Sequence, residues 1–289
     1  MPQLALIQTS CTKDPDQNLE QAIVSVREAA SRGAEVILLQ ELFLTHYFCH
    51  RVDPAAFSLA EPVPGPTTHR LRNLAKELGV VILAPLFERA DAGLYFNTLA
   101  VIDADGALLG RYRKMHIPDD PGFHEKYYFT PGDLGYKVFN TRFGRIGTLI
   151  CWDQWFPEAA RITAMKGAEL LVYPTAIATL PEENEKDRDR FMHAWKTIQQ
   201  SHAIANSCYI ATANRCGEEE ESRFWGHSFV CDPFGSIMAE AGADEEILMA
   251  SINPEEIELQ RREWPFFRDR RIDSYGQLLR RWAGVSDDE

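Results

Sequence analysis

Three side chains that could share one reaction lie at the ends of predicted strands. Glu41 directly follows the run "VILLQ", and Cys151 follows the run "RIGTLI". Lys114 lies in "LLGRYRKMHIP", where the alternation typical of a strand is lost before a proline. A thiol needs a base or a positive neighbour to become a nucleophile at neutral pH, and the oxyanion of acyl transfer needs a cation or amide donors. Together the three residues predict acyl transfer at a cysteine.

Each of these residues also has a simpler explanation when it is taken alone. A cysteine such as Cys151 is most often a small buried hydrophobe. Glu41 could mark the solvent edge of a strand, or it could be buried with a partner. Lys114 belongs to a short basic run with Arg111 and Arg113, which usually indicates a solvated surface. Only the combination favours catalysis, so the elements that would bring the three together decide the question.

The familiar motifs of other enzyme classes are absent from the sequence, including GxSxG, GxxxxGK[ST], GxGxxG behind a strand, and HExxH. One group resembles a metal site, the "HYFCH" segment with His46, Cys49 and His50. Two of its histidines could share a helix face, but no second ligand cluster is nearby and the segment follows a strand. We therefore expect ordinary loop residues here and no metal.

The composition is that of a globular protein with an acidic surface. The chain has 289 residues, 45% of them hydrophobic, and a net charge of −13 without a block of Lys or Arg. Nucleic acid and anionic membranes are therefore not expected partners. The apolar runs are far shorter than the roughly 18 residues that span a bilayer, and the first residues lack a secretion signal. The six cysteines form no CxxC pair, which fits a reducing compartment, so a cytoplasmic location is expected.

An internal repeat predicts how the strands are arranged. "AASRGAEVILLQE" (29–41) matches "TAMKGAELLVYPT" (163–175), each the end of a helix, Gly-Ala-Glu and an apolar strand. "NTLAVIDADGALLG" (97–110) matches "GHSFVCDPFGSIMA" (226–239), each a strand, a turn closed by glycine and a second strand. Continuous apolar strands need cover on both faces. We therefore predict a four-layer α-β-β-α sandwich built from two similar halves, as a single domain over residues 1–262.

Two amphipathic helices and an aromatic tail complete the expected architecture. The helices are predicted over 18–33 and 190–206, on the outside of the sheets. Residues 263–289 mix aromatic residues with arginines and show no clear period. Exposed aromatic side chains of this kind favour contact with another subunit, so we expect the tail to pack at an interface of a homo-oligomer, a dimer or a larger form.

Nearly the whole chain resembles the nitrilase, or carbon–nitrogen hydrolase, superfamily. Three segments carry the resemblance: "LLQELF" around Glu41, "YRKMHIP" around Lys114 and "GTLICWDQWFPEAAR" around Cys151. The family fold is the α-β-β-α sandwich already inferred from the repeat. The resemblance implies that no cofactor is needed, and that these three residues form a catalytic Glu-Lys-Cys triad.

The resemblance also implies a role for each catalytic residue. Glu41 would act as the general base and Cys151 as the nucleophile. Lys114 would stabilise the oxyanion together with the backbone N–H of Trp152. Many members have a second glutamate near the site, and Glu125 in "FHEKYYFTPG" occupies the matching position.

The residues after Cys151 narrow the expected substrate. Members that cleave carbamoyl amino acids tend to carry an arginine three or four positions after the cysteine, where it holds the substrate carboxylate. Gln154 and Trp155 occupy these positions here. "CWDQWFPEAARI", "ELFLTHYFC" and "YPTAI" look most like the branch that hydrolyses the ureido group of N-carbamoylputrescine to putrescine, carbon dioxide and ammonia. The expected substrate is thus a small carbamoyl amine.

Several residues could contact such a substrate. Apolar walls are expected from aromatic side chains near the nucleophile, and the amine needs an acidic partner. The full set of predicted substrate-binding residues is Tyr47, Trp152, Asp153, Gln154, Trp155, Thr175 and Glu182. The acidic run that begins at Glu182 could equally be a solvated face.

Two alternatives remain open from the sequence. One is another amidase of the superfamily, such as an aliphatic amidase, an ω-amidase or a β-ureidopropionase-like carbamoylase. The other is a noncatalytic scaffold on the same fold.

Overall fold

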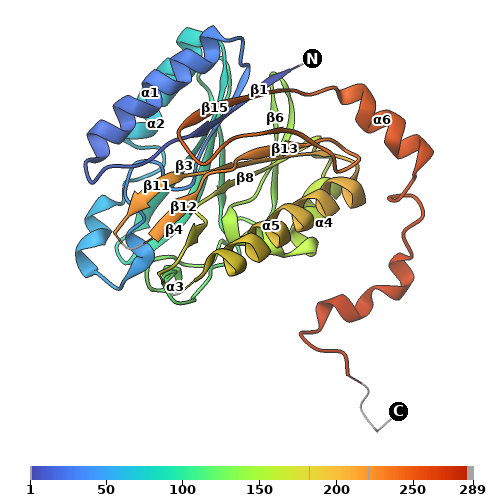
Figure 1. The fold of residues 1–289 in the computed structure, drawn as a ribbon. Helices are drawn as coiled ribbons and strands as arrows, with labels where there is room; N and C mark the ends of the chain where they lie inside the picture. The colour runs from blue at the N-terminus through green and yellow to red at the C-terminus, as the bar shows by residue number, and fades with distance from the viewer. Residues whose placement is uncertain (1, 182, 221, 285–289) are drawn as a thin grey trace.

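Two six-stranded sheets form the centre of the protein (Figure 1). The computed structural model describes residues 2–181, 183–220 and 222–284. The first sheet has the strand order β15 (Glu246–Ser251), β1 (Gln3–Gln8), β2 (Val36–Leu39), β3 (Val81–Asp91), β4 (Leu94–Ile102) and β5 (Leu108–Arg113). The second has the order β14 (Ile237–Glu240), β13 (Phe229–Cys231), β10 (Tyr209–Asn214), β8 (Leu170–Thr175), β7 (Gly144–Thr148) and β6 (Lys137–Thr141).

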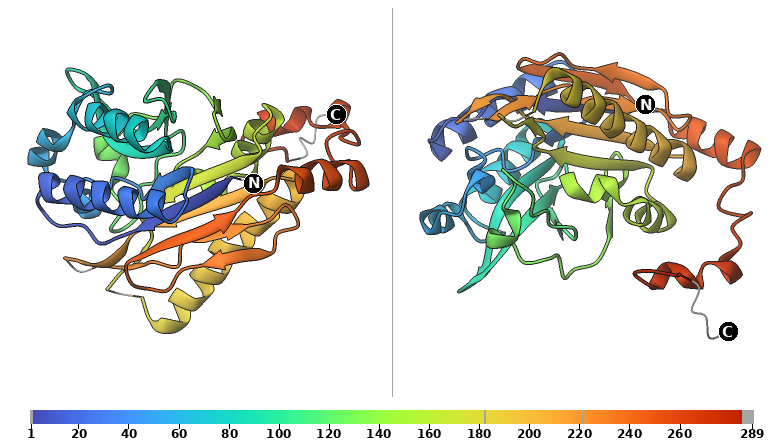
Figure 2. Two further views of the ribbon diagram at one scale, coloured as in Figure 1. Left: turned by 90° about the horizontal axis from the view of Figure 1, so that it is seen from above. Right: turned by 60° about the horizontal axis from the view of Figure 1, so that its bottom comes forward.

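Helices cover the outer face of each sheet, as the two views of Figure 2 show. The first sheet contacts α1 (Pro15–Ser31) and α2 (Pro66–Leu78). The second contacts α4 (Pro157–Met165) and α5 (Glu185–Asn206). The inner faces meet where β1 contacts β10 and β2 contacts β8. The predicted α-β-β-α sandwich is confirmed.

Burial on both faces explains the continuous apolar strands. In β1, Leu4 and Leu6 point into the core shared with the second sheet, whereas Ala5 and Ile7 pack in the core under the helices. All four side chains are buried. Because neither face of the strand meets water, the sequence shows no alternation of apolar and polar residues.

The two halves follow the same plan, as the repeat predicts. Strands β1, β2 and β3 are parallel neighbours, and so are β7, β8 and β10. Each parallel trio continues into an antiparallel pair, β4 and β5 in the first sheet and β13 and β14 in the second. Strand β7 is therefore the counterpart of β1, and β8 is the counterpart of β2.

The long helix of the second half begins earlier than the pattern predicts. Helix α5 starts at Glu185, not at 190, because the side chain of Asn184 caps it by accepting from the backbone N–H of Asp187. Part of the acidic run is thus a helical turn, whose carboxylates favour the positive end of the helix dipole. Among the described residues, no helix has both the length and the apolar character that a bilayer crossing needs.

Short elements gather beyond the ends of the parallel strands. A three-stranded sheet has the order β11 (Cys216–Glu219), β12 (Ser222–Trp225) and β9 (Ala178–Thr179). Near it lie the short helices η1 (Phe48–His50), η2 (Pro54–Leu59), α3 (Glu125–Tyr128) and η3 (Cys151–Trp155). Aromatic residues of these segments pack with one another in a separate apolar cluster. This packing joins the short elements to one another through their side chains.

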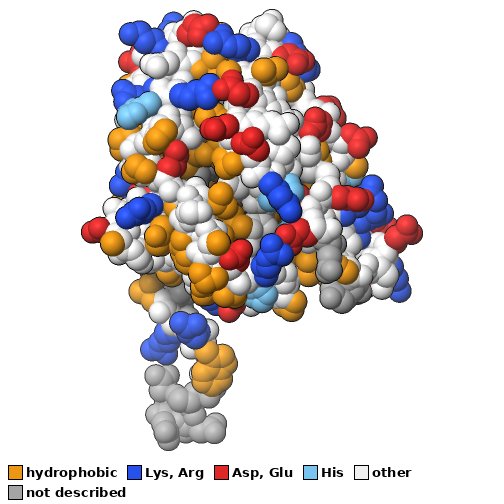
Figure 3. Space-filling view, turned by 90° about the vertical axis from the view of Figure 1, so that its left-hand side faces the viewer, with side chains coloured by type: hydrophobic (Ala, Val, Ile, Leu, Met, Phe, Trp, Pro, Cys, Tyr) orange, Lys and Arg blue, Asp and Glu red, His pale blue; other side chains and the backbone are white. Residues whose placement is uncertain are grey.

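The C-terminal segment leaves the body of the molecule. After α6 (Pro254–Glu263) the chain runs outward through the short turns η4 (Ile272–Ser274) and η5 (Gly276–Leu279), as Figure 1 shows. Large apolar side chains on it are exposed, among them Leu279 at 93% and Trp282 at 76%. The body beside it carries interspersed acidic and basic side chains, without one continuous basic area on the face in Figure 3.

We predict that removal of residues 263–289 reduces the size of the assembly in solution. The segment exposes apolar area that only another surface can remove from water, at about 25 cal/mol per Å². Light scattering after size-exclusion chromatography measures the mass. The full-length double variant Leu279→Ser, Trp282→Ser should shift the mass in the same direction. Truncated and full-length protein of the same subunit number would contradict the predicted interface role.

Candidate active site

The four predicted catalytic side chains come from four different segments beyond the strand ends. Glu41 follows β2, and Lys114 follows β5. Glu125 opens α3, and Cys151 opens η3 shortly after β7. All four are buried, with exposures of 5% or less. The two halves of the fold thus supply one site, with the thiol from the second half and the other three groups from the first and the connection between them.

A buried ammonium group links the two carboxylates. Lys114 Nζ donates to Glu41 Oε1 at 2.9 Å and to Glu125 Oε2 at 2.6 Å. None of the three side chains is more than 1% exposed. Because an unpaired charge in such a place is very unfavourable, these contacts hold the three groups in fixed positions.

Two neutral side chains complete this network. Tyr47 Oη donates to Glu125 Oε1 at 2.7 Å, and Asn97 Nδ2 donates to Glu41 Oε1 at 2.7 Å. The other oxygen of Glu41, Oε2, is buried and has no hydrogen-bond partner among the described residues. Glu41 therefore has one oxygen held by Lys114 and Asn97 and a second oxygen able to accept a proton.

Asn97 and the hydroxyl contact of Tyr47 are not predicted by the sequence pattern. Tyr47 was expected to be an apolar wall for the substrate, and its ring does pack between Phe123 and Phe224. Asn97 opens "NTLAVI", and an amide inside an otherwise apolar strand could have marked it as a residue with a buried partner.

Cys151 lies on a tight turn between β7 and α4. Its φ of +39° is uncommon for a residue other than glycine, and such positions cost of order 1–3 kcal/mol. The carboxylate of Asp153 supports the turn by accepting from the backbone N–H of Ile150 at 2.9 Å. Gly147 allows β7 to approach α4 and β8 closely, because a Cβ atom there would lie 2.5 Å from Thr163 of α4 and 2.6 Å from Leu171 of β8.

The surroundings of Cys151 keep its thiol protonated at rest. Burial raises the pKa of Cys151 well above its ordinary value, and the charge of Glu41 raises it further, against the opposing effect of Lys114. Burial alone would lower the pKa of Lys114, but the charges of Glu125 and Glu41 outweigh it and raise that pKa well above its usual range. Lys114 is thus a permanent cation, and the thiol needs a base to react.

Glu125 is the group of the site that titrates near neutrality. Burial raises the pKa of its carboxyl to about 7, although the charge of Lys114 acts in the opposite direction. The carboxylate of Glu125 also raises the pKa of the Cys151 thiol. The protonation state of Glu125 therefore affects how easily the nucleophile ionises.

The predicted substrate-binding residues differ in how far they are exposed to solvent. Trp152 and Trp155 are partly exposed, with ring centroids 6.4 Å apart, on the turn that carries Cys151. Thr175 is buried at the end of β8, where its hydroxyl donates to the carbonyl of Tyr173. Glu182 lies outside the described residues.

Asp153 and Gln154 point into the protein. In addition to the Ile150 contact, the carboxylate of Asp153 accepts from Tyr112 Oη at 2.7 Å and from the backbone N–H of His116 at 3.0 Å. Gln154 Oε1 accepts from Trp195 Nε1 at 2.7 Å and from Gln199 Nε2 at 2.9 Å. Both side chains hold the turn that carries Cys151 to its neighbours, while Gln154 Nε2 is buried without a hydrogen-bond partner among the described residues. Contact of either residue with the substrate stays a prediction.

The "HYFCH" segment does not assemble a metal site in the part of the chain that the structure describes. Cys49 is fully buried in the aromatic cluster, and His50 Nδ1 lies 3.3 Å from Ser222 Oγ.

Comparison with known proteins gives a consistent result. Residues 3–262 match the family model described as carbon–nitrogen hydrolase. The chain is 47% identical to an N-carbamoylputrescine amidase of Solanum lycopersicum, over 96% of this chain and 94% of that protein. It is 40% identical to a citrullinase of Francisella tularensis, over 96% and 98% of the two chains. The crystal structure of a carbon–nitrogen hydrolase from Helicobacter pylori superposes with a TM-score of 0.95, at 42% identity, and covers 98% of this chain and 99% of that one.

We predict that Glu125→Gln moves the pH midpoint of Cys151 alkylation to lower pH, by up to about one unit. The substitution removes a negative charge that raises the pKa of the thiol, and the amide oxygen can still accept from Lys114. The rate of iodoacetamide labelling at Cys151, followed by peptide mass spectrometry across the neutral and alkaline range, gives the midpoint. Glu88→Gln is the matched control, because Glu88 is equally buried but pairs with Arg113. A shift to higher pH in Glu125→Gln would contradict the prediction.

Proposed function

The chain belongs to the carbon–nitrogen hydrolase family, and on that premise we propose that it hydrolyses the ureido group of N-carbamoylputrescine. It is a hydrolase of carbon–nitrogen bonds other than peptide bonds. The observation that carries the proposed chemistry is the state of Glu41, which has one oxygen held by Lys114 and Asn97 and the other without a partner among the described residues.

In the first half of the reaction, Glu41 accepts the proton of the Cys151 thiol and the sulfur attacks the ureido carbon. The resting thiol is protonated, so a base beside it is required. The negative charge that develops on the substrate oxygen is stabilised by Lys114 and by the backbone N–H of Trp152. Trp152 is in the first turn of η3, where N–H groups have no acceptor within the helix.

In the second half, Glu41 returns the proton to the leaving amine, and the carbonyl group stays bound to sulfur as a thioester-like intermediate. Glu41 then takes a proton from water, and the resulting hydroxide attacks that carbon and expels the sulfur, which regains its proton from Glu41. The released carbamic acid loses carbon dioxide, which breaks the second C–N bond and frees the second amine. The overall reaction consumes one water and yields putrescine, carbon dioxide and ammonia. Glu125 holds Lys114 in place through both halves by the contact at 2.6 Å.

Three features support a carbamoyl amine as the substrate. The most similar of the relatives reported above is an N-carbamoylputrescine amidase. Gln154 and Trp155 replace the arginine that would hold a substrate carboxylate. With Glu41 and Glu125 ionised, the cluster around Lys114 carries one more negative than positive charge, which favours a cationic substrate over an anionic one.

Two other substrates are weighed against this proposal. The similarity to a citrullinase favours a ureido amino acid, which carries the same carbamoyl group together with a carboxylate. An ω-amide is the expectation for another amidase of the family. A noncatalytic scaffold is disfavoured by the intact and connected Glu41, Lys114 and Cys151.

We predict that Cys151→Ala abolishes turnover and leaves the fold intact. The substitution removes the sulfur nucleophile from a site that is 5% exposed, and alanine is smaller than cysteine, so no overpacking results. Ammonia release measures turnover, and circular dichroism measures the fold. Turnover comparable to that of the unaltered protein would end the assignment of Cys151 as nucleophile.

A substrate panel tests the specificity. We expect kcat/KM for N-carbamoylputrescine to exceed that for citrulline and for simple ω-amides by at least about tenfold, because the carboxylate of citrulline finds no arginine. Ammonia release under one set of conditions compares them, and the Cys151→Ala protein gives the background. A preference for citrulline or for an ω-amide would replace the proposed substrate but keep the proposed chemistry.

A further inference from the structure

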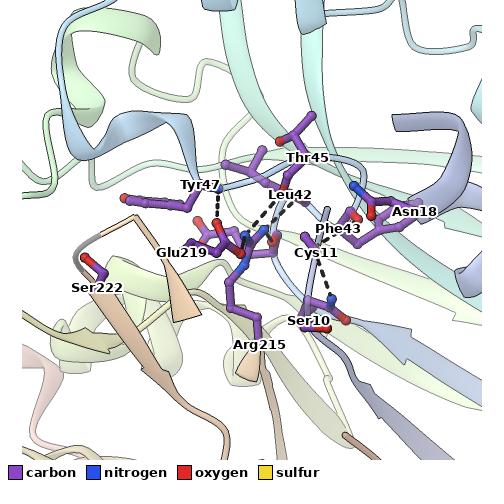
Figure 4. Close-up of polar contacts among 12 residues, drawn as sticks. Ser10, Cys11, Asn18, Leu42, Phe43, Thr45, Tyr47, Arg215, Glu219 and Ser222 are labelled. Carbon is purple, nitrogen blue, oxygen red and sulfur yellow. Dashed lines mark hydrogen bonds and ion pairs between the residues drawn. The ribbon is translucent and has the colours of Figure 1, made fainter. Parts of the chain in front are cut away.

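A buried ion pair of Arg215 and Glu219 contacts residues of the loop that follows β2, among them Leu42 and Tyr47 (Figure 4). Arg215 directly follows β10, and Glu219 is the last residue of β11. Arg215 Nη1 donates to Glu219 Oε1 at 2.7 Å, and neither side chain is more than 1% exposed. The reaction described above uses neither residue, although both are charged and enclosed by the fold.

Arg215 forms hydrogen bonds with the backbone of the segment 41–47, which begins with the proposed base Glu41. Its Nη2 donates to the backbone carbonyls of Glu41 and Leu42, both at 2.9 Å, and its Nη1 also donates to the carbonyl of Thr45 at 3.2 Å. Leu42 has a φ of +51°, which is unusual for a leucine. A guanidinium with several donors in one plane is well suited to hold carbonyl groups that point to one side of a tight turn.

Glu219 forms a hydrogen bond with the other end of the same segment. Its Oε2 accepts from the backbone N–H of Tyr47 at 2.5 Å. The hydroxyl of Tyr47 donates to Glu125, and Glu125 accepts from Lys114. The segment 41–47 therefore carries Glu41 at one end and the support of Glu125 at the other, and one ion pair from the second half of the chain fixes both ends.

We propose that Arg215 and Glu219 are positioning residues, which act through the segment 41–47 to hold the Glu41 and Glu125 carboxylates around Lys114. This inference rests on the proposed roles of Glu41 and Glu125 but not on the identity of the substrate.

The energetics of buried charge favour a positioning role over a purely stabilising one. A buried ion pair seldom stabilises a protein more than apolar residues of similar volume, because both charges must leave water. A buried pair does restrict geometry, since each charge needs its partners at defined distances. Arg215 also lies over the ring of Phe224, with Cζ 5.1 Å from the ring centroid. This contact further restricts the orientation of the guanidinium plane.

The first test uses Glu219→Gln and Arg215→Lys, each with two readouts. Displaced carboxylates should lower kcat by about 10–100-fold while KM changes by less than about threefold. Carboxylates that have moved away from Cys151 also stop raising the pKa of its thiol, so the pH midpoint of its alkylation should move to lower pH. Alkylation needs no substrate, so a wrong substrate assignment leaves this second readout valid.

The second test is a double-mutant cycle with Tyr47→Phe. If Glu219 acts through the hydroxyl of Tyr47, the loss of kcat caused by Glu219→Gln should be at least about threefold smaller in the Tyr47→Phe background. Glu88→Gln, a buried carboxylate paired with Arg113 outside this segment, should combine additively with Tyr47→Phe. Additive effects of Glu219→Gln and Tyr47→Phe would overturn the proposed route through Tyr47.

Folding controls keep the test decisive. Thermal unfolding reports stability, and labelling of the buried Cys208 reports any general opening of the structure. Arg215→Lys retains the positive charge beside Glu219. If Glu219→Gln does not fold, the same two readouts are measured on Arg215→Lys. A folded variant with a lower melting temperature, an unchanged kcat and an unchanged alkylation midpoint would assign the pair to stability alone and overturn the proposal.

Discussion

The structure of the site depends on the burial of one ammonium group between two carboxylates. Lys114 can remain charged in the interior only because Glu41 and Glu125 both contact it, at 2.9 and 2.6 Å. This requirement determines where β2, β5 and α3 must end or begin. In the proposed reaction, the same ammonium group supplies a fixed positive charge, so no counterion needs to be rearranged when negative charge develops on the substrate.

Much of the fold and part of the candidate site could be predicted from local sequence patterns. Apolar runs that end in Glu41 and Cys151 predicted polar groups at strand ends, and the repeated Gly-Ala-Glu segments predicted two similar halves. The contacts of Asn97 and Tyr47 could not be predicted in this way. The Asn97–Glu41 contact joins residues 56 positions apart, and the Tyr47–Glu125 contact joins residues 78 positions apart. Local periodicity and spacing do not predict which side chains so far apart in sequence will be in contact.

Position in sequence next to Cys151 did not predict which way each side chain points. Asp153 and Gln154 follow Cys151 directly, yet both side chains turn into the protein, whereas their neighbours Trp152 and Trp155 remain partly exposed. A 3₁₀ turn repeats every three residues, so residues 152 and 155 share one side of it. Adjacent residues on such a turn therefore have different neighbours: the side chains of Asp153 and Gln154 hold the turn in place, and those of Trp152 and Trp155 remain partly exposed.

The doubled plan of the fold does not produce two reaction centres. The strand equivalent to β2 ends in Thr175, where the first half has Glu41 close behind its strand. The strand equivalent to β7 ends in Gln8, whose side chain bonds Gly242 and Ser228 and offers no nucleophile. Each repeat thus supplies part of one proposed active site. The hydrophobic core between the two sheets holds the two halves, and therefore the two parts of the site, together. Separating the halves would leave each with a fold motif but without a complete set of reacting groups.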